Sequence, residues 1–251
     1  MFLNYYRPKS LDEALKLLGE QEPLTVPLGG GTALSQKRPI PMAIVDLQEL
    51  PLNHISRQGN HLHLGATVTL QSLVENTETP PLLAKALQHE ANLNIRNMAT
   101  VAGSLFTADG KSIFATVLLA LDARLLILPG EKEIFLGDWL PQRSDWDRKN
   151  LIVEIIIPLQ PVLKFEQVAR SPEDRPIVCL AIAEWPSGRT RIGLGGTGNA
   201  PVLAFDGPER NGADTAVENA FSQATDAFAS GAYRSQVAKV LAQRLLPGEK
   251  K

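Results

Sequence analysis

The chain has 251 residues, of which 44% are hydrophobic and 21% are charged, and its formal net charge at pH 7 is −2. This composition is ordinary for a globular protein and excludes an intrinsically disordered or collagen-like chain. The balanced charge gives no support to a nucleic-acid-binding protein or to one that binds an anionic membrane surface.

Three features of the sequence indicate where in the cell the protein is located. The single cysteine, Cys179, excludes an internal disulfide, and also an iron–sulfur cluster or cysteine zinc site held by this chain alone. The longest mostly apolar run, 114–121, is much shorter than the roughly 20 residues of a membrane span. The first eight residues lack the pattern of a signal peptide. We expect a cytoplasmic protein without a membrane span.

The first part of the chain mixes predicted helices and strands. Ser10 and Glu13 fit a capping box, which predicts a helix that Gly19 ends. Apolar patterning predicts further strands at 24–28, 43–47, 62–68 and 123–128, and helices at 69–74 and 82–91. The small and hydroxyl-bearing residues of 101–108 indicate a connection, and 114–121 fits a buried helix or a buried strand.

The second part is rich in predicted strands and ends in a helix. The predicted strands are 151–157, 165–169, 177–184 and 190–194, and the predicted helix is 227–245. The sequence Pro158-Leu159-Gln160-Pro161 is the best candidate for a domain boundary.

Two segments are candidates for a ligand site. Residues 27–32 place three glycines directly after a predicted strand, and such a loop exposes successive backbone N–H groups that can bind phosphate. Residues 100–107 combine one glycine with hydroxyl side chains that can donate to a phosphate or a ribose. A plain tight turn and an ordinary polar turn, respectively, explain the same residues.

Other patterns are interpreted as structural. Residues 193–198 match G-x-G-x-x-G, but Pro201 prevents the helix that a dinucleotide-binding motif must open. His61 and His63 share one face of a predicted strand without a third metal ligand nearby, and Cys179 lies in an apolar run typical of a core. There is no nucleophile elbow, so we predict no catalytic side chain and no metal site.

Several motifs, in a specific order along nearly the whole chain, resemble one known family. They are Tyr6–Leu15, Gly30–Thr32, Ile44–Leu47, Leu64–Thr69, Ile95–Ser104, Leu118–Ala123 and Tyr233–Arg234 with the final helix. Together they are similar to the FAD-binding medium subunit of molybdenum-containing hydroxylases. That is the family of the FAD subunit of carbon monoxide dehydrogenase and the FAD domain of xanthine dehydrogenase.

The resemblance implies an α+β fold. It comprises a two-subdomain, PCMH-like FAD-binding domain over 1–160, with subdomains of about 1–53 and 54–160, and a C-terminal subdomain of three antiparallel strands plus helices over 161–251. It also implies FAD held by its pyrophosphate against the two loops. The residues that it assigns to FAD are Pro27, Leu28, Gly29, Gly30, Gly31 and Thr32 in the first loop, and Thr100, Gly103, Ser104, Thr107 and Ser112 in and after the second.

The sequence departs from the family pattern at polar positions. Ala33 stands where an acid is usual, Ser104 where asparagine is usual, and Ile113 where an aspartate is usual. Gln167 replaces a common lysine, and residues 137–141 replace a Gly-Tyr-Arg-x-Thr stretch. Each lost polar contact weakens binding by about 1 kcal/mol.

Two functions fit these observations. In the first, the chain is an FAD-binding electron-transfer subunit, an oxidoreductase component that does not hydroxylate substrate alone. It would take electrons from an iron–sulfur subunit, within a hetero-oligomer that also holds a molybdopterin subunit, and pass them to an external acceptor. In the second, the chain is a scaffold or assembly subunit of the same fold whose FAD binding is weakened or lost. Flavin colour in protein purified with excess FAD distinguishes the two.

Overall fold

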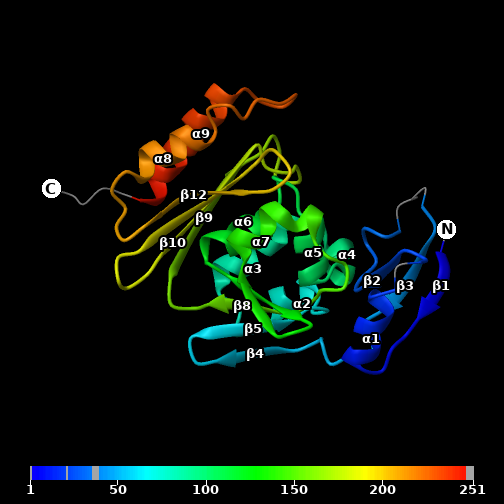
Figure 1. The fold of residues 1–251 in the computed structure, drawn as a ribbon. Helices are drawn as coiled ribbons and strands as arrows, with labels where there is room; N and C mark the ends of the chain where they lie inside the picture. Colours follow the sequence, from blue (N-terminus) through cyan, green and yellow to red (C-terminus); the bar gives the residue numbers. More distant parts are fainter. Residues whose placement is uncertain (1, 21, 36–39, 247–251) are drawn as a thin grey trace. The chain divides into compact units, whose positions relative to one another are not determined.

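The computed structural model describes residues 2–20, 22–35 and 40–246 (Figure 1). The chain divides into two compact units that are each built from several stretches of sequence. The first unit comprises Met1–Glu78, Asn92–Thr107 and Arg124–Ile156, and the second comprises Thr79–Ala91, Ala108–Ala123 and Ile157–Lys251. Two stretches of the predicted FAD-binding domain therefore group with the C-terminal strands. The functional boundary near residue 160 stays a prediction.

A three-stranded parallel sheet begins the first unit. Its strands, in spatial order, are β1 (Phe2–Tyr6), β3 (Met42–Asp46) and β2 (Thr25–Leu28). Helix α1 (Leu11–Leu18) begins at Ser10, whose hydroxyl accepts the Glu13 amide at 3.2 Å, as the capping box predicts. The central strand β3 is buried along its whole length, which explains why its apolar run could be recognised in the sequence.

A five-stranded sheet completes the core of the first unit. Its strands, in spatial order, are β4 (Ile55–Gln58), β5 (His61–Gly65), β8 (Leu151–Pro158), β6 (Arg124–Leu128) and β7 (Lys132–Phe135). The inner strands β5, β6 and β8 confirm the predicted strands to within a few residues. The edge strands β4 and β7 were not predicted, because short, partly exposed edge strands carry little apolar pattern.

Besides α1, the described part of the first unit contains several short helices. They are α2 (Leu70–Glu75), α4 (Leu93–Met98), α5 (Val101–Thr107), α7 (Leu136–Trp139) and the 3₁₀ helix η1 (Leu140–Asp145). The expectation of a non-helical connection at 101–108 is wrong, because α5 occupies that segment. Thr100 accepts the Gly103 amide through its hydroxyl at 3.2 Å, and Val101 and Leu105 bury one helical face. These two effects outweigh the low helix propensity of glycine and threonine.

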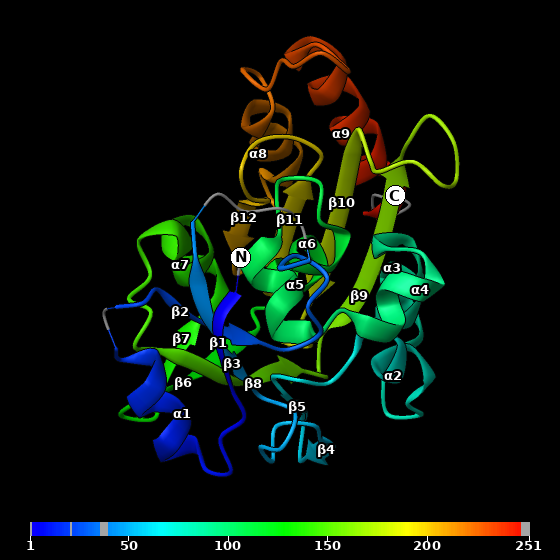
Figure 2. The same ribbon diagram turned by 90° about the vertical axis from the view of Figure 1, so that its right-hand side faces the viewer.

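The second unit is built on an antiparallel sheet with helices on both faces (Figures 1 and 2). The strands, in spatial order, are β12 (Val202–Gly207), β11 (Thr190–Gly195), β10 (Val178–Glu184) and β9 (Val162–Val168). The helices are α3 (Pro81–Glu90), α6 (Ile113–Ala120), α8 (Ala213–Ala220) and α9 (Gly231–Leu245). The sheet has four strands where the resemblance implies three, since β12 extends it at one edge. The predicted α+β class is confirmed.

The two faces of this sheet carry different side chains. Val178, Leu180 and Ile182 of β10 pack in a hydrophobic cluster with residues of α8 and α9. On the other face, helix α6 contacts β10 and β11, and all eight of its residues are buried. The segment at 114–121 is therefore a helix rather than a strand. Cys179 is buried, and its burial raises the pKa of the thiol, so the predicted core role is confirmed.

The glycine run at 193–198 lies where backbone segments pack closely. A Cβ on Gly195 would overlap Oγ1 of Thr116 on α6, and a Cβ on Gly196, whose φ is +138°, would overlap the Ile177 carbonyl. The fully buried Arg234 donates to the carbonyl oxygens of Ile177 and Gly196, the latter at 3.0 Å, and to Asp226 at 2.7 Å. The glycines therefore serve the packing of the second unit.

Candidate functional site

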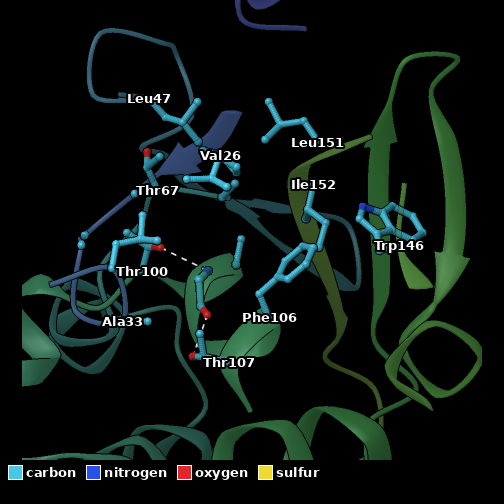
Figure 3. Close-up of a pocket in the computed structure, with 18 of the residues that line it drawn as sticks. Val26, Ala33, Leu47, Thr67, Thr100, Phe106, Thr107, Trp146, Leu151 and Ile152 are labelled. Atoms are coloured by element: carbon cyan, nitrogen blue, oxygen red, sulfur yellow. Dashed lines mark hydrogen bonds between the residues drawn. The ribbon is translucent and has the colours of Figure 1, made fainter. Parts of the chain in front are cut away.

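A pocket of about 330 Å³ lies within the first unit (Figure 3). Four stretches of chain line most of it: the end of β2 with the glycine loop that follows, the turn after β5, helix α5 with the residue before it, and the segment between η1 and β8. Its volume is in the range of small-molecule sites, about 300–1,000 Å³. Apolar walls from Val26, Leu47 and Ile152 alternate with threonine hydroxyls and glycine backbone, which suits a ligand with both ring and polar parts.

The pocket brings together the two loops that the sequence singled out. The predicted residues that line it are Pro27, Gly29, Gly30, Gly31, Thr32, Thr100, Gly103 and Thr107. Leu28 and Ser104 are not among its lining residues, although each adjoins one. Ser112 lies in the second unit, where its hydroxyl donates to Glu90 at 2.9 Å and accepts the Ala115 amide at 3.1 Å. The assignment of these residues to a cofactor stays a prediction.

The glycines of the first loop let it pack against the second. A Cβ on Gly30 would overlap the Met98 carbonyl oxygen, and a Cβ on Gly29 would lie 2.7 Å from the Thr100 hydroxyl. Gly31 has a φ of +73°, a conformation that costs other residues energy. The glycines thus shape the wall of the pocket through close approach of two backbones that are about 70 residues apart in sequence.

Hydroxyl groups fix the second loop from within. Thr100 accepts the Gly103 amide at 3.2 Å, and the Thr107 hydroxyl donates to the Gly103 carbonyl at 2.9 Å (Figure 3). A Cβ on Gly103 would lie 2.8 Å from the Thr100 hydroxyl, so only glycine fits without displacement. Both threonines line the pocket while their hydroxyls are engaged, and they can still accept or donate one further hydrogen bond to a ligand.

Sequence reasoning missed one wall of the pocket. Phe106, Arg143, Trp146 and Arg148 line it; Arg143 belongs to η1, and Trp146 and Arg148 belong to the segment between η1 and β8. No short motif marks this segment, and it follows the stretch at 137–141 that departs from the family pattern. Its aromatic side chains were the available signal, because buried tryptophans commonly form the walls of ligand pockets.

A buried carboxylate supports the strand beside the glycine loop. Asp46, at the end of β3, is 1% exposed, receives hydrogen bonds from Tyr5 and the Gln48 amide, and pairs with Arg7 at 3.0 Å. Burial acts to raise the pKa of Asp46, but these hydrogen bonds and the Arg7 charge outweigh it and hold the pKa below its usual value. The next residue, Leu47, lines the pocket, so this network fixes one of its apolar walls.

The histidines form hydrogen bonds on the five-stranded sheet. His63 Nδ1 lies 2.8 Å from one oxygen of Glu154, and His54 Nε2 lies 3.1 Å from the other. His61 and His63 are both partly buried. Among residues 2–20, 22–35 and 40–246, no group of three or more His, Cys, Asp or Glu side chains could hold a metal ion. In the same ranges, no helix has the length and apolar character needed to cross a membrane.

Comparison with known proteins identifies the family of the chain and its cofactor. A family model described as the FAD binding domain in molybdopterin dehydrogenase matches residues 1–160. The chain belongs to this family. FAD is accordingly its cofactor, and the predicted class of oxidoreductase flavoprotein component is confirmed.

Relatives of the FAD-binding family match nearly the whole chain. The uncharacterized protein YgfM of Escherichia coli (strain K12) is 29% identical over 249 residues, which cover 96% of this chain and 94% of YgfM. The glyceraldehyde dehydrogenase medium chain of Sulfolobus acidocaldarius is 27% identical, covering 96% of each chain. The crystal structure of quinoline 2-oxidoreductase from Pseudomonas putida 86 matches with a TM-score of 0.80 at 25% identity, covering 97% of this chain and 95% of the other.

The residues of the pocket fit a flavin dinucleotide. The glycine loop offers backbone N–H groups, the threonines offer hydroxyls, and the aromatic and aliphatic walls can pack on a ring system. Neither Asp nor Glu is among the pocket's lining residues within the described ranges, so no carboxylate there repels a diphosphate. The five departures from the family pattern therefore leave a pocket whose lining has polar donors and no negative charge among the described residues.

Proposed function

We propose that the pocket of the first unit holds the diphosphate-bearing part of FAD, and that the chain serves as the electron-transfer subunit of a molybdopterin-dependent dehydrogenase. The glycine loop packed against the segment from Met98 to Gly103 carries this proposal, because it forms a polar wall from two backbones. Bound FAD supplies the reversible uptake of one or two electrons. The chain's own residues bind the cofactor, orient it and limit its contact with water.

The division of chemistry between chains follows from the residues present. The one cysteine of the 251 residues is buried in the second unit, so these residues alone cannot hold an iron–sulfur cluster that feeds the flavin. We therefore propose an iron–sulfur subunit and a molybdopterin subunit as partners. The name of the Sulfolobus relative, a dehydrogenase medium chain, supports an assembly of several subunits. A cytoplasmic location remains a prediction.

The scaffold function is less favoured than electron transfer. It predicts a pocket that has closed or gained unsuitable charges, whereas the pocket is open, with a volume of about 330 Å³, and is lined by the glycine loop and by threonine hydroxyl groups. The argument for weakened FAD binding remains that Ala33 and Ser104 replace the acid and the asparagine that are usual in the family. Flavin content, rather than fold, therefore separates the two functions.

Reconstitution with FAD tests the proposed function. The protein is incubated with excess FAD, freed of unbound flavin by gel filtration, and its visible spectrum and flavin-to-protein ratio are measured. We expect a yellow protein with about one FAD per chain. Reduction by dithionite and reoxidation by candidate acceptors would then show electron transfer. A colourless, folded protein with an intact thermal transition would favour the scaffold function instead.

A further inference from the structure

The charged residues of the pocket are all of one sign. Within the described part of the chain, Arg143 and Arg148 are the charged residues that line it. Both belong to the segment between the start of η1 and the start of β8. Figure 3 shows Trp146, from the same segment, across the pocket from Thr100 and Ala33. A cavity that carries only positive charge concentrates anionic ligands.

The loop that carries Arg148 is closed by its own hydrogen bonds. Trp146 Nε1 donates to the Asn150 carbonyl at 3.2 Å, and the Asn150 amide donates to the Asp147 carbonyl at 2.9 Å. The Asp147 side chain also accepts the Lys149 amide at 3.1 Å. Arg148 therefore lies in the middle of a tight loop whose backbone is held before any ligand binds. Such preorganisation reduces the ordering cost of binding.

Aromatic packing fixes the loop against the helix of the second predicted segment. The ring centroids of Trp146 and Trp139 are 5.9 Å apart at 83°, and those of Trp139 and Phe106 are 5.2 Å apart at 73°. Phe106 belongs to α5 and lines the pocket, whereas Trp139 is 2% exposed. Edge-to-face pairs of this kind stabilise the packing beyond what their buried area contributes.

The two arginines differ in how they are held. Arg143 Nη1 donates to the Leu140 carbonyl at 2.7 Å, which ties its guanidinium to η1. Arg148 is exposed and, among the residues that the structure describes, forms no hydrogen bond or ion pair. A guanidinium presents a rigid set of donors that matches phosphate oxygens in a bidentate arrangement. Arg148 is thus the side chain of this wall with its full donor capacity available.

We propose that Arg148 binds the diphosphate of the dinucleotide and makes the pocket prefer FAD to riboflavin. The inference rests on the proposed function, since it takes the ligand to be a flavin. Arg143 adds a second, anchored positive charge to the same wall. The segment between η1 and β8 in this way offsets the polar contacts that are absent at Ala33 and Ser104.

A pair of charge-reversal variants tests the role of Arg148. Arg148→Glu and Lys149→Glu change the net charge equally, one residue apart, but the Lys149 side chain does not line the pocket. The affinities for FAD and riboflavin are measured by flavin fluorescence titration at low and at high salt, with Arg148→Gln as a milder variant. The unfolding transition of each variant is recorded to confirm that it folds.

The expected results are specific to the residue and to the ligand. Arg148→Gln weakens FAD binding about tenfold and Arg148→Glu about a hundredfold, whereas riboflavin binding changes less than about twofold. Lys149→Glu behaves as the wild type with both ligands. Equal effects of the two charge reversals, or equal affinity of the wild type for FAD and riboflavin, would overturn the inference alone. If the wild type binds no flavin, the proposed function and this inference fail together.

Discussion

Two glycine-rich segments of this molecule resemble each other in sequence but have different structural roles. Residues 29–31 pack against the backbone at Met98 and the Thr100 side chain, and all three glycines line the pocket of the first unit. In the run at 193–198, Gly195 and Gly196 contact helix α6 and the Ile177 carbonyl, and none of the run lines that pocket. A glycine pattern therefore indicates that something approaches the backbone closely. The surroundings decide whether that is a ligand wall or a protein core.

The largest expected effect is in the second unit, at the buried arginine beside its glycine run. Replacing Arg234 by methionine removes the donor to two carbonyl oxygens and leaves the charge of Asp226 without its partner. Arg234 is fully buried but Asp226 is 27% exposed, so most of the loss comes from the two carbonyl oxygens left without a donor, at about 1–3 kcal/mol each and about 2–6 kcal/mol together. We expect Arg234→Met to lower the free energy of unfolding by this amount in urea titrations.

A second arginine on the same helix provides the control. Arg244 of α9 pairs with Glu166 at 2.8 Å, but its side chain is 62% exposed. Exposed ion pairs contribute about 0–1 kcal/mol, so Arg244→Met should change stability little. Equal losses in the two variants would show that Arg234 acts through general helix packing rather than through its buried hydrogen bonds.

The next effect concerns the contact between the glycine run and α6. A Cβ on Gly195 would overlap the Thr116 hydroxyl and lie 3.0 Å from the Gly110 carbonyl. Overpacking of this kind costs about 1–3 kcal/mol, so Gly195→Ala should be destabilising while the FAD content of the folded protein stays unchanged.

A double-mutant cycle can locate this cost. Thr116→Ala removes the hydroxyl that Gly195→Ala would strike, although it also removes a hydrogen bond to the Ser112 carbonyl at 2.7 Å. We expect the double variant to be more stable than the sum of the two single losses predicts, because the overlap is relieved. Strict additivity would mean that the clash is with the Gly110 backbone instead.

The accuracy of the sequence predictions varied with how locally each feature is determined. Helix α1 and strand β3 were predictable, because a capping box and a fully apolar strand are local signals. Helix α5 was not, since its formation depends on the Thr100 cap and on burial of Val101 and Leu105. Strand β12 was also missed, because its short apolar stretch does not alternate with polar residues and its pairing with β11 defines it.

The candidate site shows the same dependence. The two loops were predicted from glycine and hydroxyl patterns together with the family resemblance, and the structure brings both to one pocket. The wall with Trp146 and Arg148 was missed, because aromatic side chains are a weak signal and the position of this loop beside the pocket depends on the folded chain. Gln167 is a second feature that the sequence does not reveal. Its side-chain oxygen is buried without a hydrogen-bond partner among the described residues, and no sequence pattern indicates this.

A glycine in the first unit gives a smaller effect on stability but a decisive one on the cofactor. Gly31 has a φ of +73°, and its Cβ would reach 3.3 Å from the Leu28 side chain. A valine there would be strained and would narrow the pocket wall. We expect Gly31→Val to cost about 1–2 kcal/mol of stability and to abolish FAD retention on gel filtration.

Gly59 allows the strain to be separated from the loss of binding. It lies between β4 and β5 with a φ of +59°, nothing lies within 4 Å of its Cβ position, and it does not line the pocket. Gly59→Val should therefore suffer similar backbone strain and keep its flavin. Retained flavin in folded Gly31→Val would instead remove the first loop from the binding site.

The smallest expected effect is a pH dependence of stability in the second unit, which Asp226 should carry. Burial acts to raise the pKa of Asp226, but hydrogen bonds from the Phe228 and Ala229 amides and from Arg234 outweigh it and lower the pKa to about 2. Since the unfolded carboxyl titrates near pH 3.9, the unfolded state binds more protons between these values. The stabilisation is therefore fully present above about pH 5 and is lost as the pH falls towards 2. Between pH 6 and pH 3 the expected loss in the free energy of unfolding is about 1 kcal/mol.

Urea unfolding of the wild type and of Asp226→Asn across this pH range tests this expectation. The free energies of unfolding of the two proteins, plotted against pH, should converge as the pH falls. Curves that stay parallel would mean that other carboxylates, such as Asp109 and Asp206, carry the acid sensitivity of the unit.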